Sequence, residues 1–122
     1  MQLGAFSISL NVKDIKKSHQ FYEKLGFHVI GGNRDQFWLI LKNDDAVIGL
    51  FQNMIDKNTL TFNPGWNQEG NEIDPFMDIR VINNKLTENN IIVKASIDSD
   101  EGPAYLFIED PDGNPILIDQ HR

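Results

Sequence analysis

The same order of predicted elements occurs twice along this chain of 122 residues. In the first half, alternation of polar and apolar side chains predicts a strand over residues 6–12. A helix follows, which Asp14 can cap and which ends before Gly26, a residue suited to the left-handed conformation after a helix. Three strands come next, and the last two form a hairpin around residues 43–45. The first half is therefore predicted to fold as a βαβββ module.

The second half is predicted to repeat that order, with little identity between the copies. A strand is expected at residues 76–81, a short helix at residues 83–89, and a closing hairpin with its turn at residues 110–113. Asn90 takes the place of Gly26 after the helix. Two divergent copies of one unit explain this recurrence most simply. The parts of the expected single domain (residues 1–122) are a first module at residues 1–53, a joining loop at residues 54–74 and a second module at residues 75–122.

The composition narrows the classes of protein to which the chain can belong. Its hydrophobic content of 40% and charged content of 24% are ordinary for a soluble globular protein. It has neither an apolar run of the roughly 18 residues that cross a membrane nor the features of a signal peptide. The absence of cysteine excludes disulfides and thiolate metal sites. We therefore expect a cytoplasmic protein with no membrane partner.

The net charge of −7 is concentrated in the second half of the chain. Residues 61–122 contain twelve acidic and four basic side chains, whereas residues 1–60 contain six acidic and seven basic ones. Because nucleic-acid affinity depends on cationic contacts to phosphate, the acidic half argues against a nucleic-acid partner. It is compatible with a cationic small molecule, and also with a solvated surface that promotes solubility.

Two segments resemble the ends of one known fold. Residues 21–27, with the sequence FYEKLGF, end the first predicted helix, and residues 109–114, with the sequence EDPDGN, form the turn of the last hairpin. At this separation, with the repeated module between them, they resemble the vicinal-oxygen-chelate superfamily, which includes glyoxalase I, extradiol dioxygenases and bleomycin-resistance proteins. The resemblance implies an α+β fold in which two βαβββ modules form a curved eight-stranded mixed sheet around a central cavity.

The metal-binding members of that superfamily place four ligands on the first and last strands of the modules. The matching positions in this chain are Ser7, Gly49, Phe76 and Leu117. None of these side chains supplies the imidazole or carboxylate that a divalent ion needs, and the three histidines lack ligand spacing. The resemblance therefore implies a protein without metal or cofactor, in which metal-dependent lyase or dioxygenase chemistry is not expected.

Strand alternation predicts which side chains fill the vacated cavity, because residues two apart on a strand share a face. Across the first hairpin, Trp38 should oppose Phe51 and Ile40 should oppose Gly49. Trp66 belongs to the joining loop, which is expected to be either a lid that places Trp66 over the cavity or a plain connector. The same aromatic residues would instead form a packed core if the cavity were filled. The residues expected to contact a ligand are Ser7, Ser9, Trp38, Phe51, Trp66, Phe76, Asp78, Arg80, Tyr105 and Phe107.

Three functions are compatible with these residues. The first is a metal-free protein of the bleomycin-resistance type that binds a small organic molecule in an aromatic cleft. The second is a glyoxalase-family enzyme, of lyase or dioxygenase type, with an unusual site around Ser7, Asp78 and Tyr105. The third is a non-catalytic interaction subunit with a filled cavity. No catalytic residue stands out in any of them. A homodimer is expected, since the superfamily usually covers exposed sheet edges by pairing.

Overall fold

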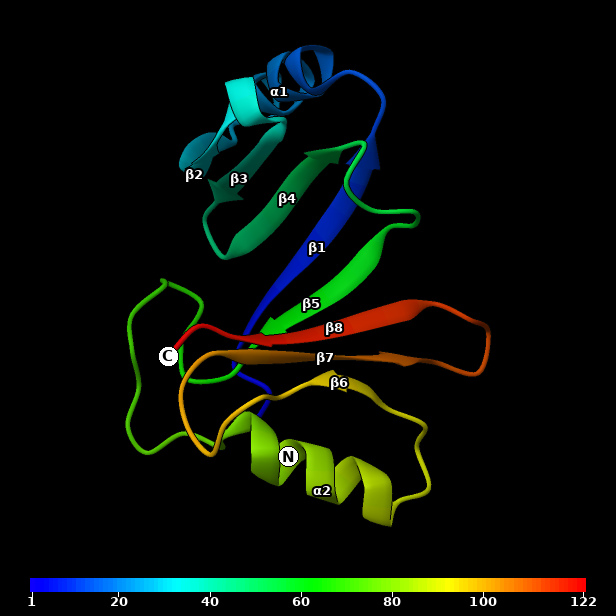
Figure 1. Ribbon diagram of the computed structural model, residues 1–122. Coiled ribbons are helices and arrows are strands. Elements are labelled where there is room, and N and C mark those ends of the chain that lie inside the picture. The colour runs from blue at the N-terminus through cyan, green and yellow to red at the C-terminus, as the bar shows by residue number, and fades with distance from the viewer. The chain divides into compact units, whose positions relative to one another are not determined.

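The computed structural model describes all residues, 1–122, and contains eight β-strands and two α-helices (Figure 1). The strands are β1 (Ala5–Val12), β2 (His28–Asn33), β3 (Trp38–Asn43), β4 (Ala46–Gln52), β5 (Thr59–Asn63), β6 (Lys94–Ser96), β7 (Ala104–Glu109) and β8 (Pro115–Gln120). The helices are α1 (Ile15–Lys24) and α2 (Ile79–Glu88), and a 3-10 turn spans Arg34–Gln36. Neither α-helix is long and apolar enough to cross a membrane.

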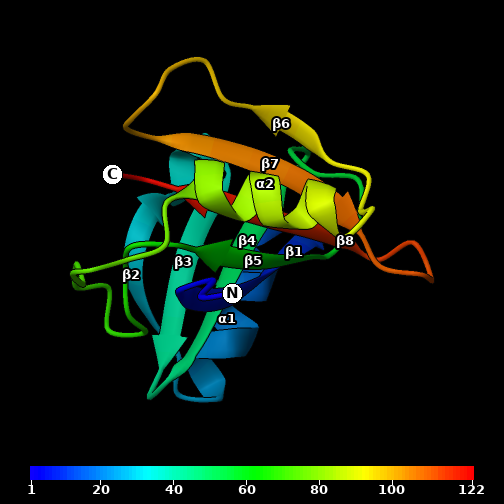
Figure 2. The same ribbon diagram turned by 90° about the horizontal axis from the view of Figure 1, so that it is seen from below.

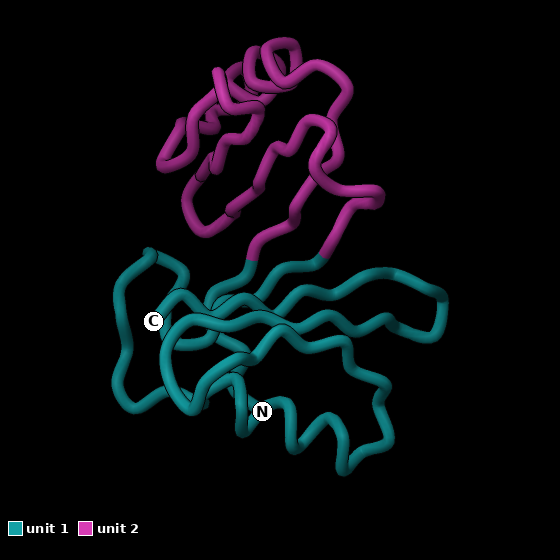
Figure 3. Tube along the Cα trace, in the orientation of Figure 1, with its two compact units in different colours: residues 1–6, 60–122 teal, residues 7–59 magenta.

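The strands form a mixed sheet in the order β2-β3-β4-β1-β5-β8-β7-β6. β1 pairs with β4 and β5 pairs with β8 in parallel, whereas the β2–β3, β3–β4, β6–β7 and β7–β8 pairs are antiparallel. The expected α+β fold with an eight-stranded mixed sheet is confirmed. By its internal contacts the chain divides into unit 1, which is residues 1–6 with 60–122, and unit 2, which is residues 7–59 (Figure 3).

In unit 2, α1 covers one face of the strands. The helix begins after Asp14, whose carboxylate accepts hydrogen bonds from the backbone nitrogens of Lys16 and Lys17 at 3.1 and 3.2 Å. Ile15, in the first turn of the helix, is buried against leucines of β3 and β4. These leucines are Leu39, Leu41 and Leu50. Leucines alternate with other residues along β3, so the face of this strand that carries them is directed toward α1.

The register of the β3–β4 hairpin determines which residues share the opposite face of unit 2. Trp38 pairs with Phe51 and Ile40 pairs with Gly49, so the pairing predicted from the sequence is confirmed. Because these residues alternate with the buried leucines, their side chains lie on the face that α1 does not cover.

In unit 1, α2 covers one face of β5, β8 and β7, and Figure 2 shows the helix running alongside β7. Ile79, Ile82 and Leu86 recur at helical spacing and are at most 3% exposed. They pack against Leu106 of β7 and Ile118 of β8, which are equally buried. Each of these buried side chains contributes roughly 1.5–3 kcal/mol relative to an exposed one. This core determines which face of unit 1 remains open.

The structure corrects the expected elements in the middle of the chain. The strand expected at residues 76–81 is wrong, because the apolar residues from Ile79 onward follow helical spacing and belong to α2. Asp78 caps this helix by accepting a hydrogen bond from the Arg80 backbone at 2.9 Å. The strand that precedes α2 is β5, inside the segment 54–74 that was expected to be only a loop. Its alternating threonine, leucine and phenylalanine residues are typical of a half-buried strand, but neighbouring glycine, proline and asparagine residues obscured the pattern.

The segment between β5 and α2 is fastened to the end of the chain by Arg122. The guanidinium donates hydrogen bonds to the carbonyl oxygens of Gly65 at 3.2 Å and Ile73 at 2.9 Å, and to the carboxylate of Asp74 at 3.0 Å. It also lies 4.4 Å from the centroid of the Phe76 ring, which is a cation–π contact. Phe76, which was expected on a strand facing the cavity, is therefore held in this loop.

Candidate functional site

Gly49, one of the positions matched to a metal ligand, pairs with Ser9 across the parallel β1–β4 ladder of unit 2. The phenyl ring of Phe51 lies over this glycine, since a Cβ atom at residue 49 would be only 2.5 Å from Cε2 of Phe51. Phe51 in turn stacks on Trp38, with ring centroids 6.4 Å apart and ring planes 8° from parallel. The space that a ligand side chain would need at residue 49 is therefore taken by an aromatic pair.

The strand register also changes which residue of the second half corresponds to the metal-ligand position on the first strand of a module. Thr61 of β5 pairs with Leu117 of β8, as Ser9 of β1 pairs with the glycine of β4. Counting back two residues along each first strand places Thr59 at the position equivalent to Ser7. Phe76, the residue matched from the sequence alone, lies outside the strands. That match is therefore wrong, and the position carries a neutral hydroxyl.

The corrected set of four positions does not fit a divalent metal. It consists of a serine, a glycine, a threonine and a leucine, none of which offers an imidazole or a carboxylate. Across the whole chain, no group of three or more His, Cys, Asp or Glu side chains is arranged to hold a metal ion. These four residues therefore do not supply the ligands that the metal chemistry implied by the resemblance would need.

The face of unit 1 that α2 does not cover carries two exposed aromatic rings. Tyr105 and Phe107 alternate on β7 with the buried Leu106, and they are 45% and 39% exposed. Their rings meet edge to face, with centroids 6.0 Å apart. These two expected ligand-contacting residues are therefore brought together on an open platform rather than packed into a core.

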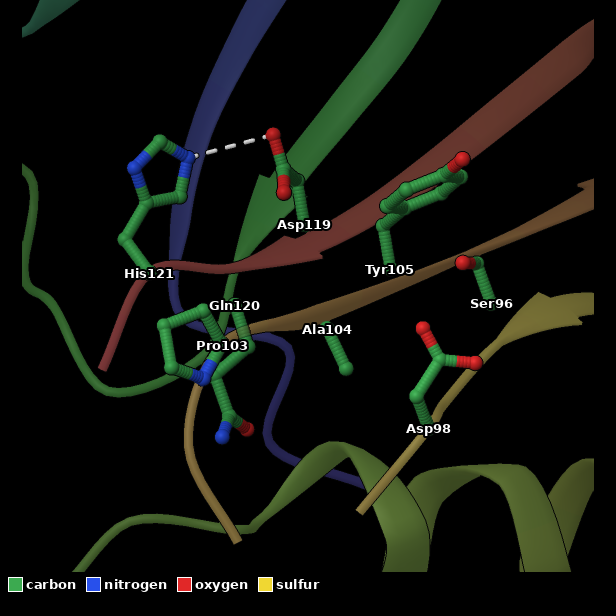
Figure 4. Close-up of a pocket in the computed structure, with 8 residues that line it drawn as sticks. All are labelled: Ser96, Asp98, Pro103, Ala104, Tyr105, Asp119, Gln120 and His121. Carbon is green, nitrogen blue, oxygen red and sulfur yellow. Dashed lines mark hydrogen bonds and ion pairs between the residues drawn. The ribbon is translucent and has the colours of Figure 1, made fainter.

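A hollow of about 470 Å³ adjoins this platform where β7 begins and β8 ends (Figure 4). Tyr105 lies directly across from Ser96 on β6 and from Asp119 on β8, so a hydroxyl, a phenol and a carboxylate form one row across three strands. Figure 4 shows these three side chains projecting from the same side of the sheet. The residues that line the hollow, all in unit 1, are Ser96, Asp98, Pro103, Ala104, Tyr105, Asp119, Gln120 and His121.

Asp119 and His121 form an ion pair at the edge of the hollow, with Oδ2 of the carboxylate 3.1 Å from Nε2 of the imidazole. The hydrogen bond to Asp119 raises the pKa of His121, and the partial burial of the ring, which acts in the opposite direction, offsets only part of this effect. At neutral pH the imidazole is therefore cationic more often than an isolated histidine would be, and it screens the charge of Asp119.

Trp66, the residue expected to act as a lid, packs against the same histidine. The indole and the His121 imidazole have ring centroids 5.1 Å apart and planes inclined at 44°. The carbonyl oxygen of Trp66 accepts a hydrogen bond from the backbone of Ala5 at 2.9 Å. The loop that carries Trp66 is thus attached next to the Asp119–His121 pair, and its movement as a lid stays a prediction.

Asp78 and Arg80 lie apart from the aromatic platform, because both belong to the start of α2. The Arg80 guanidinium pairs with the Asp78 carboxylate at 3.1 Å and donates to the carbonyl oxygens of Ser99 at 2.9 Å and Gly102 at 3.0 Å. Burial alone raises the pKa of Asp78, but hydrogen bonds from the Arg80 backbone, the Gln120 amide and the Arg80 guanidinium outweigh it and lower the pKa. This pair supports the loop at residues 97–103, which forms one wall of the hollow.

Gln120 connects that pair to the last strand. Its side chain is 1% exposed, and its carbonyl oxygen accepts a hydrogen bond from the backbone of Ile79 at 2.7 Å. Its amide nitrogen donates to the carboxylate of Asp78 at 3.1 Å and to the carbonyl oxygen of Gly102 at 3.2 Å. A single buried amide therefore joins the start of α2, the loop at residues 97–103 and the end of β8.

The expected ligand-contacting residues thus separate into several groups. Ser7, Ser9, Trp38 and Phe51 share a face of unit 2, and Tyr105 and Phe107 share the open face of unit 1. Phe76 and Asp78 line a second hollow of about 530 Å³ in unit 1, beside Met1 and Val81. The expected set of ligand-contacting residues left out five that line the first hollow, although strand alternation from Leu117 places Asp119 on the same face and leads on to His121. These five are Ser96, Asp98, Asp119, Gln120 and His121.

Comparison with known proteins gives one family. The family model for the “Glyoxalase/Bleomycin resistance protein/Dioxygenase superfamily” matches residues 4–118. No curated protein matches the chain.

Solved structures similar to this chain share its fold at low sequence identity. A glyoxalase/bleomycin resistance protein/dioxygenase superfamily member from Vibrio splendidus 12B01 is 18% identical, with a TM-score of 0.66, over 94% of this chain and 97% of the other. A structure described as NAD-dependent benzaldehyde dehydrogenase from Legionella pneumophila is 16% identical, with a TM-score of 0.70, over 96% of this chain and 99% of the other. An extradiol ring-cleaving dioxygenase from B. fuscum is 18% identical, with a TM-score of 0.61, over 98% of this chain but only 33% of the dioxygenase.

Proposed function

Because this chain belongs to the glyoxalase/bleomycin resistance protein/dioxygenase superfamily, we propose that it binds a small organic molecule without the aid of a metal ion. The observation that carries the proposal is the open aromatic platform of Tyr105 and Phe107 beside a hollow with hydrogen-bonding side chains. Small-molecule sites typically combine apolar and aromatic walls with a few polar groups that orient the ligand. The row of Ser96, Tyr105 and Asp119 supplies such groups.

The exposure of the two rings is the energetic argument for a ligand. Tyr105 and Phe107 leave about two-fifths of their surface in water, although the same sheet offers a buried face on which Leu106 and Ile118 are packed. Covering apolar surface is worth roughly 25 cal/mol per Å², and an aromatic pair adds about 0.5–1.5 kcal/mol. A flat molecule placed over the platform gains both contributions.

The metal-free part of the proposal rests on unit 2. The ring of Phe51 occupies the space next to Gly49, and the corrected set of ligand positions contains no imidazole or carboxylate. Binding is therefore proposed to depend on aromatic stacking and hydrogen bonds alone. We do not propose catalysis, since Asp78, the acid expected in an unusual active site, is already engaged by Arg80 and Gln120.

A thermal-shift screen of a compound library, with and without added divalent metals, tests this function. Binding to the folded state raises its stability by mass action, by about 2.7 kcal/mol at a ligand concentration 100 times Kd. Phe107→Ala should abolish the shift produced by a bound compound. Phe21→Ala is the matched control, because Phe21 is also an exposed phenylalanine but lies on α1, and it should retain the shift. The proposal fails if no compound raises Tm, or if the shift requires a metal.

We also propose that the protein forms a homodimer. β2 and β6 lie at the edges of the sheet, and an unpaired strand edge is a site of association. Unit 2 in addition exposes Phe21, Leu25 and Ile30, each with more than half of its surface in contact with solvent. Light scattering should give twice the monomer mass of 13.9 kDa, and a monomer mass throughout the micromolar range would rule the dimer out.

A further inference from the structure

The hollow beside the aromatic platform has carboxylates on two sides and no basic side chain other than His121 in its lining. Asp119 enters from β8, directly across from Tyr105. Asp98 enters from the other side, two residues after the end of β6. In Figure 4 Asp119 and the Tyr105 ring project to the same side of the strands, and Asp98 lies across β7 from them, beside Ala104. An acidic group on each side of an exposed aromatic ring is an arrangement that suits a positive charge above the ring.

The position of Asp98 is held by the rest of unit 1. The loop at residues 97–103 is fastened by the Arg80 guanidinium, which donates hydrogen bonds to the carbonyl oxygens of Ser99 and Gly102. The buried Gln120 amide donates to Gly102 as well. Fastening the loop that carries Asp98 reduces the conformational entropy that its backbone loses when a ligand arrives.

The charges around the hollow favour a cation over an anion. Unit 1 contains twelve acidic and four basic side chains. Two of the four basic residues, Arg80 and Arg122, are held in ion pairs within the unit. Lys94 belongs to the neighbouring row, where it lies across from Phe107, and it is not part of the lining. An anion in the hollow would face Asp98 and Asp119 with His121 as its single counter-charge.

We propose that this hollow selects a flat organic cation, with an amine or amidinium group between Asp98 and Asp119 and a planar part over Tyr105 and Phe107. This inference rests on the proposed function, because it names the ligand class of the same site. The two carboxylates bind the cationic group, the tyrosine ring adds a cation–π contact, and the Ser96 hydroxyl accepts a further hydrogen bond from the ligand.

Three probes of one shape and different charge test the ligand class. Benzamidine is cationic, benzamide is neutral and benzoate is anionic, and each carries the same ring. Titration monitored by calorimetry, or by the emission of Trp66 next to His121, should give benzamidine at least a tenfold lower Kd than benzamide. Benzoate should bind most weakly. The preference for benzamidine should decrease as salt is added, because the carboxylate contacts are partly exposed to solvent.

Two matched substitutions locate the charge contact. Asp98→Asn should weaken benzamidine binding about tenfold and leave benzamide binding unchanged. Asp100→Asn removes the same charge from an exposed position of the same loop that does not line the hollow, so it should leave both affinities unchanged. Asp119→Asn should have a smaller effect than Asp98→Asn, because His121 already screens the Asp119 charge.

The outcomes separate this inference from the function on which it rests. Equal affinities for benzamidine and benzamide overturn the cation preference, whereas binding of any neutral aromatic compound at Phe107 leaves the proposed function standing. Equal losses from Asp98→Asn and Asp100→Asn also overturn the inference, since the attraction then comes from the general acidity of unit 1. If none of the probes and no library compound binds, both proposals fail.

Discussion

In unit 2 the aromatic side chains opposite the helix pack on one another, whereas in unit 1 the corresponding rings face solvent. Trp38 and Phe51 are half-buried and stacked, and Phe51 closes the space beside Gly49. Tyr105 and Phe107 are exposed and adjoin a hollow with polar side chains. The charge differs as well, with one excess basic residue in unit 2 and eight excess acidic residues in unit 1. Similar strand–helix units can thus pack one aromatic pair and leave the other exposed to solvent.

Removing one aromatic ring from each unit should give the largest difference in the free energy of unfolding. Phe51→Ala should lower the free energy of unfolding by about 3 kcal/mol, because it deletes a ring packed against Trp38 and Gly49. Phe107→Ala should lower it by less than about 1 kcal/mol, because the ring is already exposed. Urea denaturation measures both values. Equal losses would mean that the two faces do not differ as described.

A methyl group added beside Phe51 should have the next largest effect. Gly49→Ala places a Cβ atom 2.5 Å from the Phe51 ring and should destabilise the fold by roughly 1–3 kcal/mol. Gly31→Ala is the matched control on the same sheet of unit 2, because its Cβ atom would meet Ile40 at an ordinary 3.7 Å. In a Phe51→Ala background, the effect of Gly49→Ala should largely disappear. If it persists, Phe51 is not what fills the space.

Acid should weaken unit 1 through Asp78. Because the pKa of Asp78 in the folded protein lies below the reference value of 3.8, its stabilising contribution is present above that pH and is lost as the pH falls through the folded value. Asn keeps the capping role but removes the charge, so Asp78→Asn should reduce stability at pH 6 by about 1–2 kcal/mol. It should also flatten the acid side of the pH profile. Asp100→Asn serves as the control in urea titrations from pH 6 to pH 2, and an equal change in its profile would contradict the assignment.

The smallest effect is expected from the Asp119–His121 pair. The raised pKa of His121 means that its stabilising contribution is present below the unfolded value of 6.5 and is lost as the pH rises through the folded value. Asp119→Asn should therefore lower the pKa of His121 in an NMR titration. A His121 titration that is unaltered by Asp119→Asn would show that the hydrogen bond is not formed in solution.

Several features of the fold follow from residues only a few positions apart. The helical stripe and the Asp14 cap locate α1, and the short turn after residue 43 sets the register that pairs Trp38 with Phe51. Gly26 and Asn90 both adopt the left-handed conformation that their places after the helices predict, with φ of 98° and 61°. The family resemblance could also be recognised from the sequence, because it depends only on the two end motifs and their separation along the chain.

The second half was harder to predict because the strand and its helix are separated by a long irregular segment. β5 ends at residue 63 and α2 begins at residue 79, so no local pattern links them. The apolar residues at 76 and 77 then suggested a strand in the wrong place, and three expected site residues, Phe76, Asp78 and Arg80, followed that error. What places β5 in the sheet is its pairing with β8, more than fifty residues later in the chain.

Local periodicity, caps and turn residues were therefore enough to predict the first module and the faces of its hairpin residues, whereas the fold class followed from the family resemblance. The meeting of Asp98, Tyr105 and Asp119 around one hollow depended on packing, because these residues come from separate strands and a loop held by Arg80. The closure of Gly49 by the Phe51 ring was likewise decided by side-chain packing. Local patterns reflect the conformations of neighbouring residues, whereas a binding surface is formed by residues that are distant in the chain and that only the packed core brings together.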